Sequence, residues 1–182
     1  MFLSIGMLKL NYFLADIFIL SAEKQPIKLS WRKIECLRAG KTQVLATRAV
    51  NAQIRTGGNI LILTYNKTLS NYLRYRINDV RADFYWNKLH ISHYHHFFKE
   101  QAQTIGKHVY FNSFDNTTFF DNKENDIEHF DAIFIDEVQS YKSEWLQILY
   151  NKFLKENGEF VVFGDPKQNI YKEILIQMEI FV

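Results

Sequence analysis

Two short apolar runs, each ending in acidic residues, place the strongest constraint on how this chain folds. The first is IFIDEVQ, from Ile133 to Gln139, and the second is FVVFGDPKQNIY, from Phe160 to Tyr171. β-Branched and aromatic residues without polar alternation are typical of strands buried on both faces of a parallel sheet. The sequence therefore predicts an α/β domain with a mainly parallel sheet flanked by helices.

Polar side chains stand where these two strands are predicted to end. Open parallel sheets bind ligands just outside the carboxyl ends of their strands. We therefore expect Asp136, Glu137, Asp165 and Gln168 to meet along one crevice. The functional chemistry of the domain is predicted to lie there.

The acidic pair suits metal-assisted phosphoryl transfer. Asp136 can hold a hydrated magnesium ion, and Glu137, one residue later, can face the attacking water. Gln168 offers an amide that can contact a terminal phosphate. An isolated Asp-Glu pair is equally well explained as a polar strand terminus, so the rest of the chain has to decide between these interpretations.

A phosphate-binding segment lies upstream, at Ala39 to Thr42 (AGKT), between a predicted strand at Lys33–Leu37 and a predicted helix at Lys41–Ile54. Backbone N–H groups at a helix N-terminus attract anions, and Gly40 permits their close approach. In such loops a lysine neutralises the β- and γ-phosphates and a threonine hydroxyl binds magnesium. Lys41 and Thr42 fit these two roles.

Four blocks in this order resemble the P-loop, Ia, II and III motifs of UvrD/Rep-like superfamily 1 DNA helicases. They are AGKTQVLATRA, ILILTYNKTLSNYL, IFIDEVQSYKSEWL and VVFGDPKQNIY, and they cover roughly Ile34 to Tyr171. The resemblance implies a three-layer, RecA-like P-loop NTPase domain that binds ATP and Mg²⁺. In that family ATP hydrolysis drives movement along single-stranded DNA; RNA is the alternative strand.

The resemblance also assigns contacts to particular residues. It places Tyr65, Asn66, His95 and Tyr171 on the nucleic-acid strand, and it makes Gln25 a candidate adenine contact. It gives Gln168 a second role, the coupling of the γ-phosphate to the strand. An aromatic face such as Tyr65 can stack on a base. The competing interpretation of Asn66 is that it caps the helix predicted at Lys67–Ile77.

The phosphate loop departs from the family pattern at two positions. Glu35 and Arg38 stand where the loop usually has glycine, and side chains there obstruct backbone freedom and close approach. Glu35 also adds negative charge near the phosphates. We therefore expect a reduced affinity for ATP. A smaller departure is Ser140, where relatives of motif II often carry aspartate.

The two ends of the chain carry further expectations. Residues 1–32 are predicted to be a leader, either a core-packing helix or an unstructured segment, because Lys9, Asn11 and Asp16 interrupt its apolar stretch and argue against a membrane span. Residues 33–182 are predicted to form the helicase-type ATP-binding domain, truncated after motif III. A single cysteine fits a reducing, cytoplasmic location.

Because residues 172–182 are too few for a second RecA-like domain, we expect activity to require that domain or a companion chain. Three functions remain open: an ATPase domain that is weak or inactive alone, a non-catalytic module that binds single-stranded nucleic acid, or a degenerate remnant. The net charge of only +2 gives no global attraction to nucleic acid, so any such surface must be local.

The remaining segments are predicted from their patterns. Apolar runs predict strands at Ile60–Thr64 and Leu89–Ser92, and an amphipathic pattern predicts a helix at Lys142–Leu154, followed by a strand from Glu159 to Phe163. His108–Phe130 is polar and predicts a long surface loop. The three histidines His93, His95 and His96 match no zinc signature.

Overall fold

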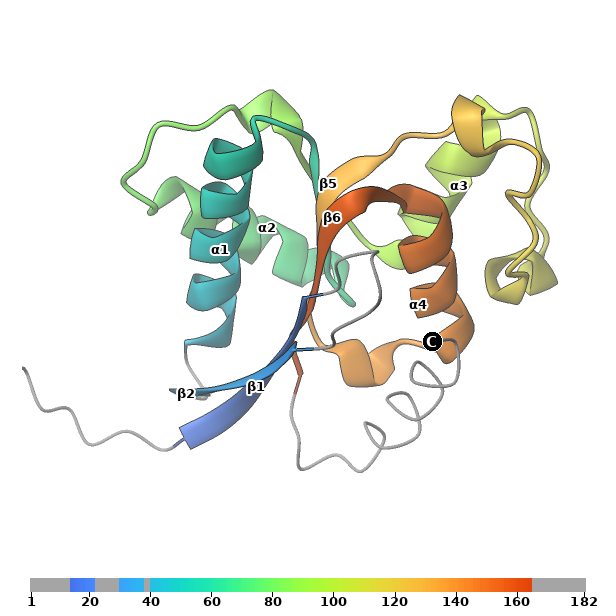
Figure 1. Ribbon diagram of the computed structural model, residues 1–182. Helices are drawn as coiled ribbons and strands as arrows, with labels where there is room; N and C mark the ends of the chain where they lie inside the picture. The colour runs from blue at the N-terminus through green and yellow to red at the C-terminus, as the bar shows by residue number, and fades with distance from the viewer. Residues whose placement is uncertain (1–13, 22–29, 38–39, 165–182) are drawn as a thin grey trace, which may run out of the picture.

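The computed structural model describes residues 14–21, 30–37 and 40–164. Its centre is a four-stranded parallel sheet in the order β4–β3–β5–β6. Figure 1 shows this sheet edge on, with helices α1 and α2 on one side and α3 and α4 on the other. The predicted three-layer α/β architecture is therefore confirmed.

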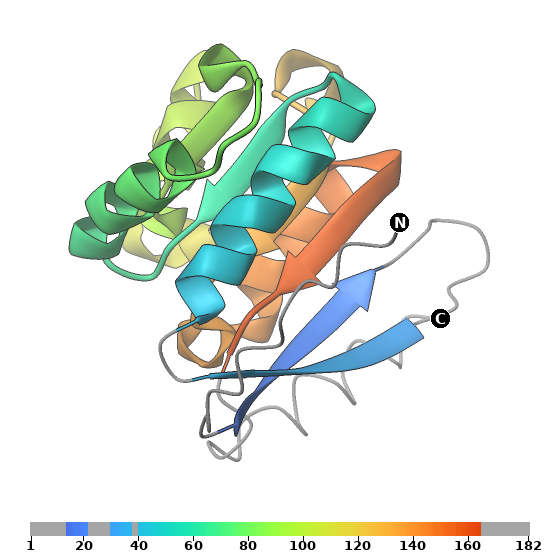
Figure 2. The same cartoon turned by 90° about the vertical axis from the view of Figure 1, so that its left-hand side faces the viewer.

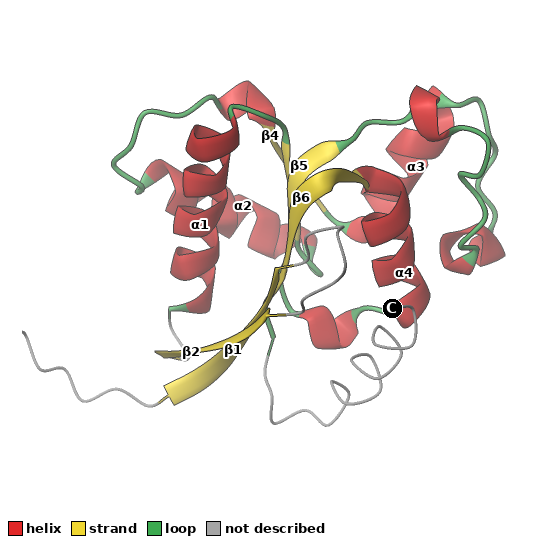
Figure 3. Cartoon of the chain, in the orientation of Figure 1, coloured by secondary structure: helices red, strands yellow, loops and turns green. Residues whose placement is uncertain are grey.

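The elements follow one another along the chain in βα order. The strands are β3 (Ile60–Leu63), β4 (Leu89–Ser92), β5 (Phe130–Ile135) and β6 (Leu154–Val162). The helices are α1 (Lys41–Thr56), α2 (Lys67–Asn78), α3 (Tyr94–Thr104) and α4 (Ser143–Ile148), and Figure 3 separates them from the strands by colour. Short helical turns are η1 (Trp86–Lys88), η2 (Phe111–Asp115), η3 (Glu124–Asp126), η4 (Val138–Ser140) and η5 (Leu149–Phe153).

Alternation along each strand sends side chains to two separate cores. In β3, for example, Ile60 and Ile62 join the core under α1, whereas Leu61 and Leu63 join the core under α3. All four of these side chains are fully buried. Burial on both faces is what the uninterrupted apolar runs of the sequence predict.

The core under α1, here called the α1-side core, brings the helix close to the sheet. Ala46, Ala49 and Ala52 lie on the buried face of α1, where small side chains allow a short distance between backbones. The helix ends at Gly57, whose φ of 64° is left-handed and whose N–H donates to the Gln53 carbonyl at 2.8 Å. A helix held this closely gives its first residue a fixed position.

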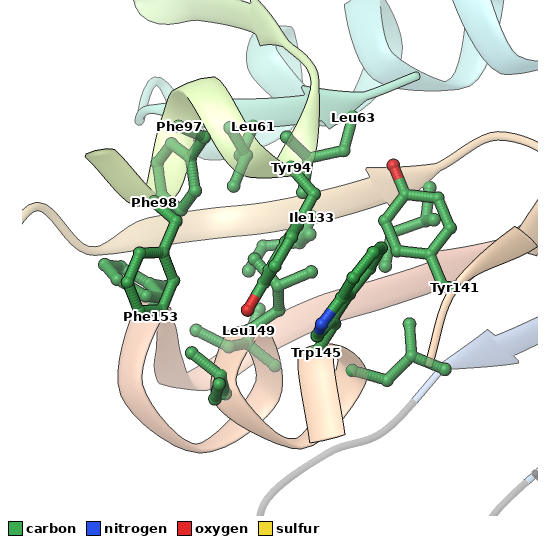
Figure 4. Packing of buried hydrophobic residues seen from close by; sticks show 14 of the residues in the cluster. Leu61, Leu63, Tyr94, Phe97, Phe98, Ile133, Tyr141, Trp145, Leu149 and Phe153 are labelled. Atoms are coloured by element: carbon green, nitrogen blue, oxygen red, sulfur yellow. The ribbon is translucent and has the colours of Figure 1, made fainter. Parts of the chain in front are cut away.

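The core under α3 and α4, here called the α3-side core, is built largely from aromatic rings. Figure 4 shows Tyr94 and Trp145 lying face to face, and their ring centroids are 4.5 Å apart. Phe153 makes edge contacts with Phe97 at 4.8 Å and with Phe120 at 5.0 Å. Offset and edge-on aromatic pairs of this kind add stability beyond the area they bury.

The N-terminal segment differs from the prediction. Where we expected a helix or an unstructured leader, Leu14–Ser21 forms strand β1, and the strand predicted at Lys33–Leu37 is longer, at Ser30–Leu37 (β2). The two pair as an antiparallel hairpin that is separate from the parallel sheet, and β1 lies next to β6. The pairing of this strand with β1 was not predicted, because pairing partners are set by tertiary contacts that local pattern does not encode.

Two further predictions need correction. The segment His108–Phe130 is not a purely surface loop, because Phe114, Phe120 and Ile127 are buried in the α3-side core. The helix predicted at Lys142–Leu154 ends at Phe153 with one π turn, and β6 already begins at Leu154. A bulge between the Phe130 and Ala132 pairings lets β6 start early and still place Glu159 opposite Ala132.

The described residues include no helix that is long and apolar enough to cross a membrane.

Candidate active site

The start of α1 and the loop after β5 lie at the same end of the sheet. Figure 1 shows both at the lower end, and Figure 2, turned by 90°, shows α1 in front of the sheet. This end holds the carboxyl ends of β3, β5 and β6, because all three strands run parallel. The sequence predicts the functional site at this end of the sheet.

Lys41 and Glu137 meet directly across this end. The Lys41 Nζ lies 3.5 Å from Glu137 Oε1, and the two side chains are only 15% and 31% exposed. Lys41 is the first residue of α1, and Glu137 lies just after β5. Two residues almost one hundred positions apart in sequence are thus brought together, as the motif interpretation predicts.

Asp136 lies beside this pair and is 4% exposed. Burial, followed by repulsion from the Glu137 carboxylate, raises its pKa to about 6. The positive charge of Lys41 and the Glu137 N–H, which donates to Asp136 Oδ1 at 3.0 Å, act in the opposite direction. A buried carboxylate that is repelled by a neighbouring carboxylate is a group that a bound cation would stabilise.

The backbone after β5 fixes both acids. The Asp136 N–H donates to the Leu63 carbonyl and the Val138 N–H to the Phe163 carbonyl, each at 2.9 Å, so the loop is held by both neighbouring strands. Glu137 adopts a left-handed conformation with φ of 53°, which is uncommon for a side chain of its size. Its carboxylate accepts a hydrogen bond from the Gln139 side chain. This turn directs Glu137 toward α1.

Gly40 and Thr42 flank Lys41 at the start of α1. Gly40 caps the helix, and its carbonyl accepts from the Val44 N–H at 2.9 Å. Thr42 is half-buried in the first turn. Among the residues predicted for the nucleotide site, Lys41, Asp136 and Glu137 lie together, Thr42 follows Lys41 in α1, and Gln168 lies outside the described residues. Gln25, Arg38, Asp165 and Tyr171 also lie outside them, as does the side chain of Glu35.

Sequence reasoning missed Tyr141, which the structure places close to this site. The side chain is 4% exposed, and its hydroxyl has no hydrogen-bond partner among the described residues. Burial raises the pKa of Tyr141, and charge on Asp136 and Tyr65 adds to the shift. Tyr141 thus lies between the acidic pair and the segment after β3. The only available signal was an aromatic residue four positions after an Asp-Glu pair, which is too weak to assign a role.

The segment after β3 carries two predicted nucleic-acid contacts. Tyr65 is 57% exposed, so its ring is available for stacking. Asn66 caps α2, because its side-chain oxygen accepts from the Thr68 N–H at 2.9 Å. The capping interpretation of Asn66 is therefore confirmed. Buried Thr64 holds the segment in place through the Asn66 carbonyl at 3.1 Å and the Ser70 hydroxyl at 2.8 Å.

His95, the third predicted contact, lies in the first turn of α3. The ring is exposed on one side and makes edge contacts with Phe114 at 4.6 Å and with Trp145 at 4.7 Å on the other. Partial burial lowers its pKa, so the ring is predominantly neutral at pH 7. His93, which caps α3, has its pKa lowered by burial and by nearby positive groups that include Lys67. β3 and β4 pair side by side up to Leu63 and Ser92, so the segments that lead into α2 and α3 begin next to each other.

The parallel sheet, the helix that starts at Lys41 and the acids after β5 together define a nucleotide-binding α/β domain of the P-loop NTPase class. Comparison with protein families agrees with this class. The chain belongs to the AAA domain family, whose model matches residues 38–173. No curated protein and no solved structure gave a significant match.

Proposed function

We propose that this domain is the first ATP-binding domain of a superfamily 1 helicase of the UvrD/Rep-like type, in which ATP hydrolysis drives movement along single-stranded DNA. The observation that carries the proposal is the contact between Lys41 and Glu137 at 3.5 Å, with buried Asp136 beside it. The order of the four motifs along the chain supports the helicase type within the wider class.

The residues at this end of the sheet suit ATP and Mg²⁺. A hydroxyl from Thr42 and a carboxylate from Asp136 are the oxygen ligands that magnesium prefers. The raised pKa of Asp136 shows that its negative charge is poorly compensated here, which is consistent with a site that receives a cation. Bound magnesium would neutralise charge that develops on the transferred phosphoryl group.

The protein side chains then have separate roles. Lys41 exchanges its contact with Glu137 for the terminal phosphates, and Glu137, released from the lysine, orients the attacking water. The left-handed backbone of Glu137 and the hydrogen bond from Gln139 hold the carboxylate in place for this role. Gln168 contacts the terminal phosphate through its amide and couples phosphate binding to the contact with the nucleic-acid strand.

We propose low ATP affinity and slow hydrolysis for this domain by itself. Glu35 and Arg38 replace glycines in the phosphate loop and restrict close backbone approach. An arginine supplied from a second domain is worth about 10³–10⁵ in rate in related NTPases. A second RecA-like domain, in the same protein or in a companion chain, would supply it.

The decisive test is phosphate release from ATP by the purified chain, with and without a single-stranded DNA oligonucleotide. We expect slow release that the oligonucleotide stimulates and that Glu137→Gln and Lys41→Ala abolish. Glu156→Gln, on the exposed bulge of β6, is the matched control and should retain the wild-type rate. A rate that Glu137→Gln leaves unchanged would refute the proposal.

A second candidate function is a module that binds single-stranded nucleic acid without turnover. The exposure of Tyr65, together with the position of α2 and α3 directly after the paired strands β3 and β4, favours it. Binding that weakens with salt in the absence of any ATPase activity would select this function. Tyr65→Ala should then lose about 1–3 kcal/mol of binding free energy, which is the range for base stacking. A folded protein that shows neither activity would be a degenerate remnant.

A further inference from the structure

A groove of about 370 Å³ runs along β4, which β3 separates from the strand that carries the acids, β5. All four residues of β4 line the groove, and β4 is the edge strand of the sheet that residues 40–164 form. One wall includes Arg74 of α2. The opposite wall includes His96 and Glu100 of α3 and Glu128, which precedes β5. The open edge of the sheet is thus hollowed along its full length.

The hydrogen bonds around β4 show which backbone groups face the groove. The Thr64 N–H donates to the Ser92 carbonyl at 3.0 Å, so the Ser92 carbonyl faces β3. Because carbonyl directions alternate along a strand, the backbone groups of Leu89 and Ile91 face away from β3. The hydrogen bond from Arg74 to the Ile91 carbonyl, at 3.3 Å, agrees with this direction.

Two of the four outward groups are already satisfied, and the remaining two form a specific pattern. The Leu89 N–H donates to the Trp86 carbonyl, and Arg74 donates to the Ile91 carbonyl. The Leu89 carbonyl and the Ile91 N–H are not covered by these bonds. They flank His90, and a residue of a parallel strand opposite His90 would donate to the first and accept from the second. An antiparallel partner would require the two groups that are already occupied.

Charges in the groove select the kind of segment that fits. The carboxylates are engaged: Glu100 lies 3.1 Å from His96 and 3.4 Å from His90, and Glu128 lies 3.8 Å from His90. Hydrogen bonding to Glu128 raises the pKa of His90, which increases the positive charge near pH 7. Lys88 and Arg74 have no carboxylate partner in the part of the chain that the structure describes. The groove thus carries two basic and two acidic side chains, and among the described residues the charges without an oppositely charged neighbour are the positive ones, on Lys88 and Arg74.

We propose that this groove docks an extended, acidic peptide segment of a partner protein, which pairs with β4 as a parallel fifth strand. The Leu89 carbonyl and the Ile91 N–H supply the backbone bonds, and Lys88 and Arg74 attract the acidic side chains. Strand addition to an exposed edge combines main-chain hydrogen bonds for affinity with side-chain contacts for specificity. The groove ends at Ser92 and His96, so the docked segment would lie next to the start of α3.

The test is binding of a fluorescein-labelled nonapeptide of alternating glutamate and valine to the full chain, followed by fluorescence anisotropy. We expect saturable binding that weakens with salt, and at least tenfold weaker binding of the lysine–valine nonapeptide. Lys88→Gln should weaken binding about two- to fivefold, the range for an exposed ion pair. Lys99→Gln, on the exposed part of α3 outside the groove, is the matched control. No binding up to millimolar protein would overturn the proposal.

Backbone pairing has its own readouts. Two versions of the peptide, N-methylated at the odd-numbered or at the even-numbered residues, test the pairing. One version should lose binding and the other should keep it, because only every second peptide N–H faces β4. In hydrogen exchange, the Ile91 amide should gain protection when the peptide binds, whereas the amides facing β3 should change little. Equal tolerance of both methylation frames would rule out strand addition. Protection of Ile91 that rises with protein concentration alone would identify a second copy of this chain, and not an acidic partner, as the occupant.

Discussion

The two cores of this domain, one on each face of the sheet, position different parts of the candidate site. The α1-side core uses small side chains to hold one helix close, and that helix starts at Lys41. The α3-side core is thick and aromatic, and Tyr141 and Trp145 lie in it just beyond the acidic pair. Close packing positions the lysine, and aromatic packing supports the loop that carries the acids. The comparison can be tested by disturbing each core separately.

The largest expected loss of stability comes from emptying the α3-side core. Phe153→Ala removes a fully buried ring that contacts Phe97 and Phe120, and should lower the free energy of unfolding by about 3–5 kcal/mol. Phe153→Leu, which leaves a smaller cavity, is the control and should cost less. Urea unfolding followed by fluorescence measures both. Equal losses for the two variants would show that aromatic contact and volume matter little here.

Asp136, at the junction of the two cores, should make stability depend on pH. Burial raises its folded-state pKa to about 6, above the ordinary value of about 3.9, so the unfolded chain releases this proton first. The contribution of this group is fully present below about pH 4 and is lost as pH rises toward 6, by up to about 3 kcal/mol. Asp136→Asn should flatten this decline.

The pH dependence is measured by urea unfolding between pH 4 and 7, with Asp126→Asn, an exposed aspartate paired with Lys123, as the control. Parallel declines for the wild type and Asp136→Asn would contradict the assignment of this dependence to Asp136.

A larger side chain should destabilise the protein more in the α1-side core than on the exposed side of α1. Ala49 is fully buried where α1 meets the sheet, so Ala49→Leu should cost about 1–3 kcal/mol through overpacking. By displacing α1 it should also weaken nucleotide binding. Asn51→Leu, on the exposed side of the same helix, introduces the same side chain where it meets solvent and should cost little. Intact nucleotide binding in a destabilised Ala49→Leu protein would separate helix position from function.

The smallest expected effect is a gain in stability. Tyr141→Phe removes a buried hydroxyl that has no partner among the described residues, so it should raise the free energy of unfolding by about 1 kcal/mol. Thermal unfolding at pH 7 measures the gain. Tyr94→Phe is the control: the Tyr94 hydroxyl donates to the Phe114 carbonyl at 2.9 Å, so its removal should lower the free energy of unfolding. A loss on Tyr141→Phe would indicate that the hydroxyl binds water or a ligand.

Sequence alone predicted the parts of the fold that carry strong local signals. The apolar runs at Ile60 and Ile133 predicted buried parallel strands, and they placed Asp136 and Glu137 directly after the strand that begins near Ile133. The contact between Lys41 and Glu137 followed from strand order and motif order. These features depend on local pattern combined with one general rule about where parallel sheets bind ligands.

Features that depend on tertiary context could not be read in the same way. The hairpin of β1 and β2 depends on pairing partners, and the burial of Phe114 and Phe120 depends on space left by α3. Polar neighbours in the 108–130 segment concealed those aromatic anchors. The groove exists because β4 lies at the edge of the described sheet. The residue types of β4 do not predict this position.

One contact at the far side of α1 bears on how the site could respond to a ligand. Glu159 of β6 binds both Arg48, at 2.7 Å, and Arg55, so the middle and the end of α1 are tied to the sheet. Only the Lys41 end has an ion pair that a triphosphate would replace. Lys41 can therefore exchange its ion-pair partner while the middle and the C-terminal end of α1 stay fixed to the sheet. Ligand binding would then change the structure only near the start of α1.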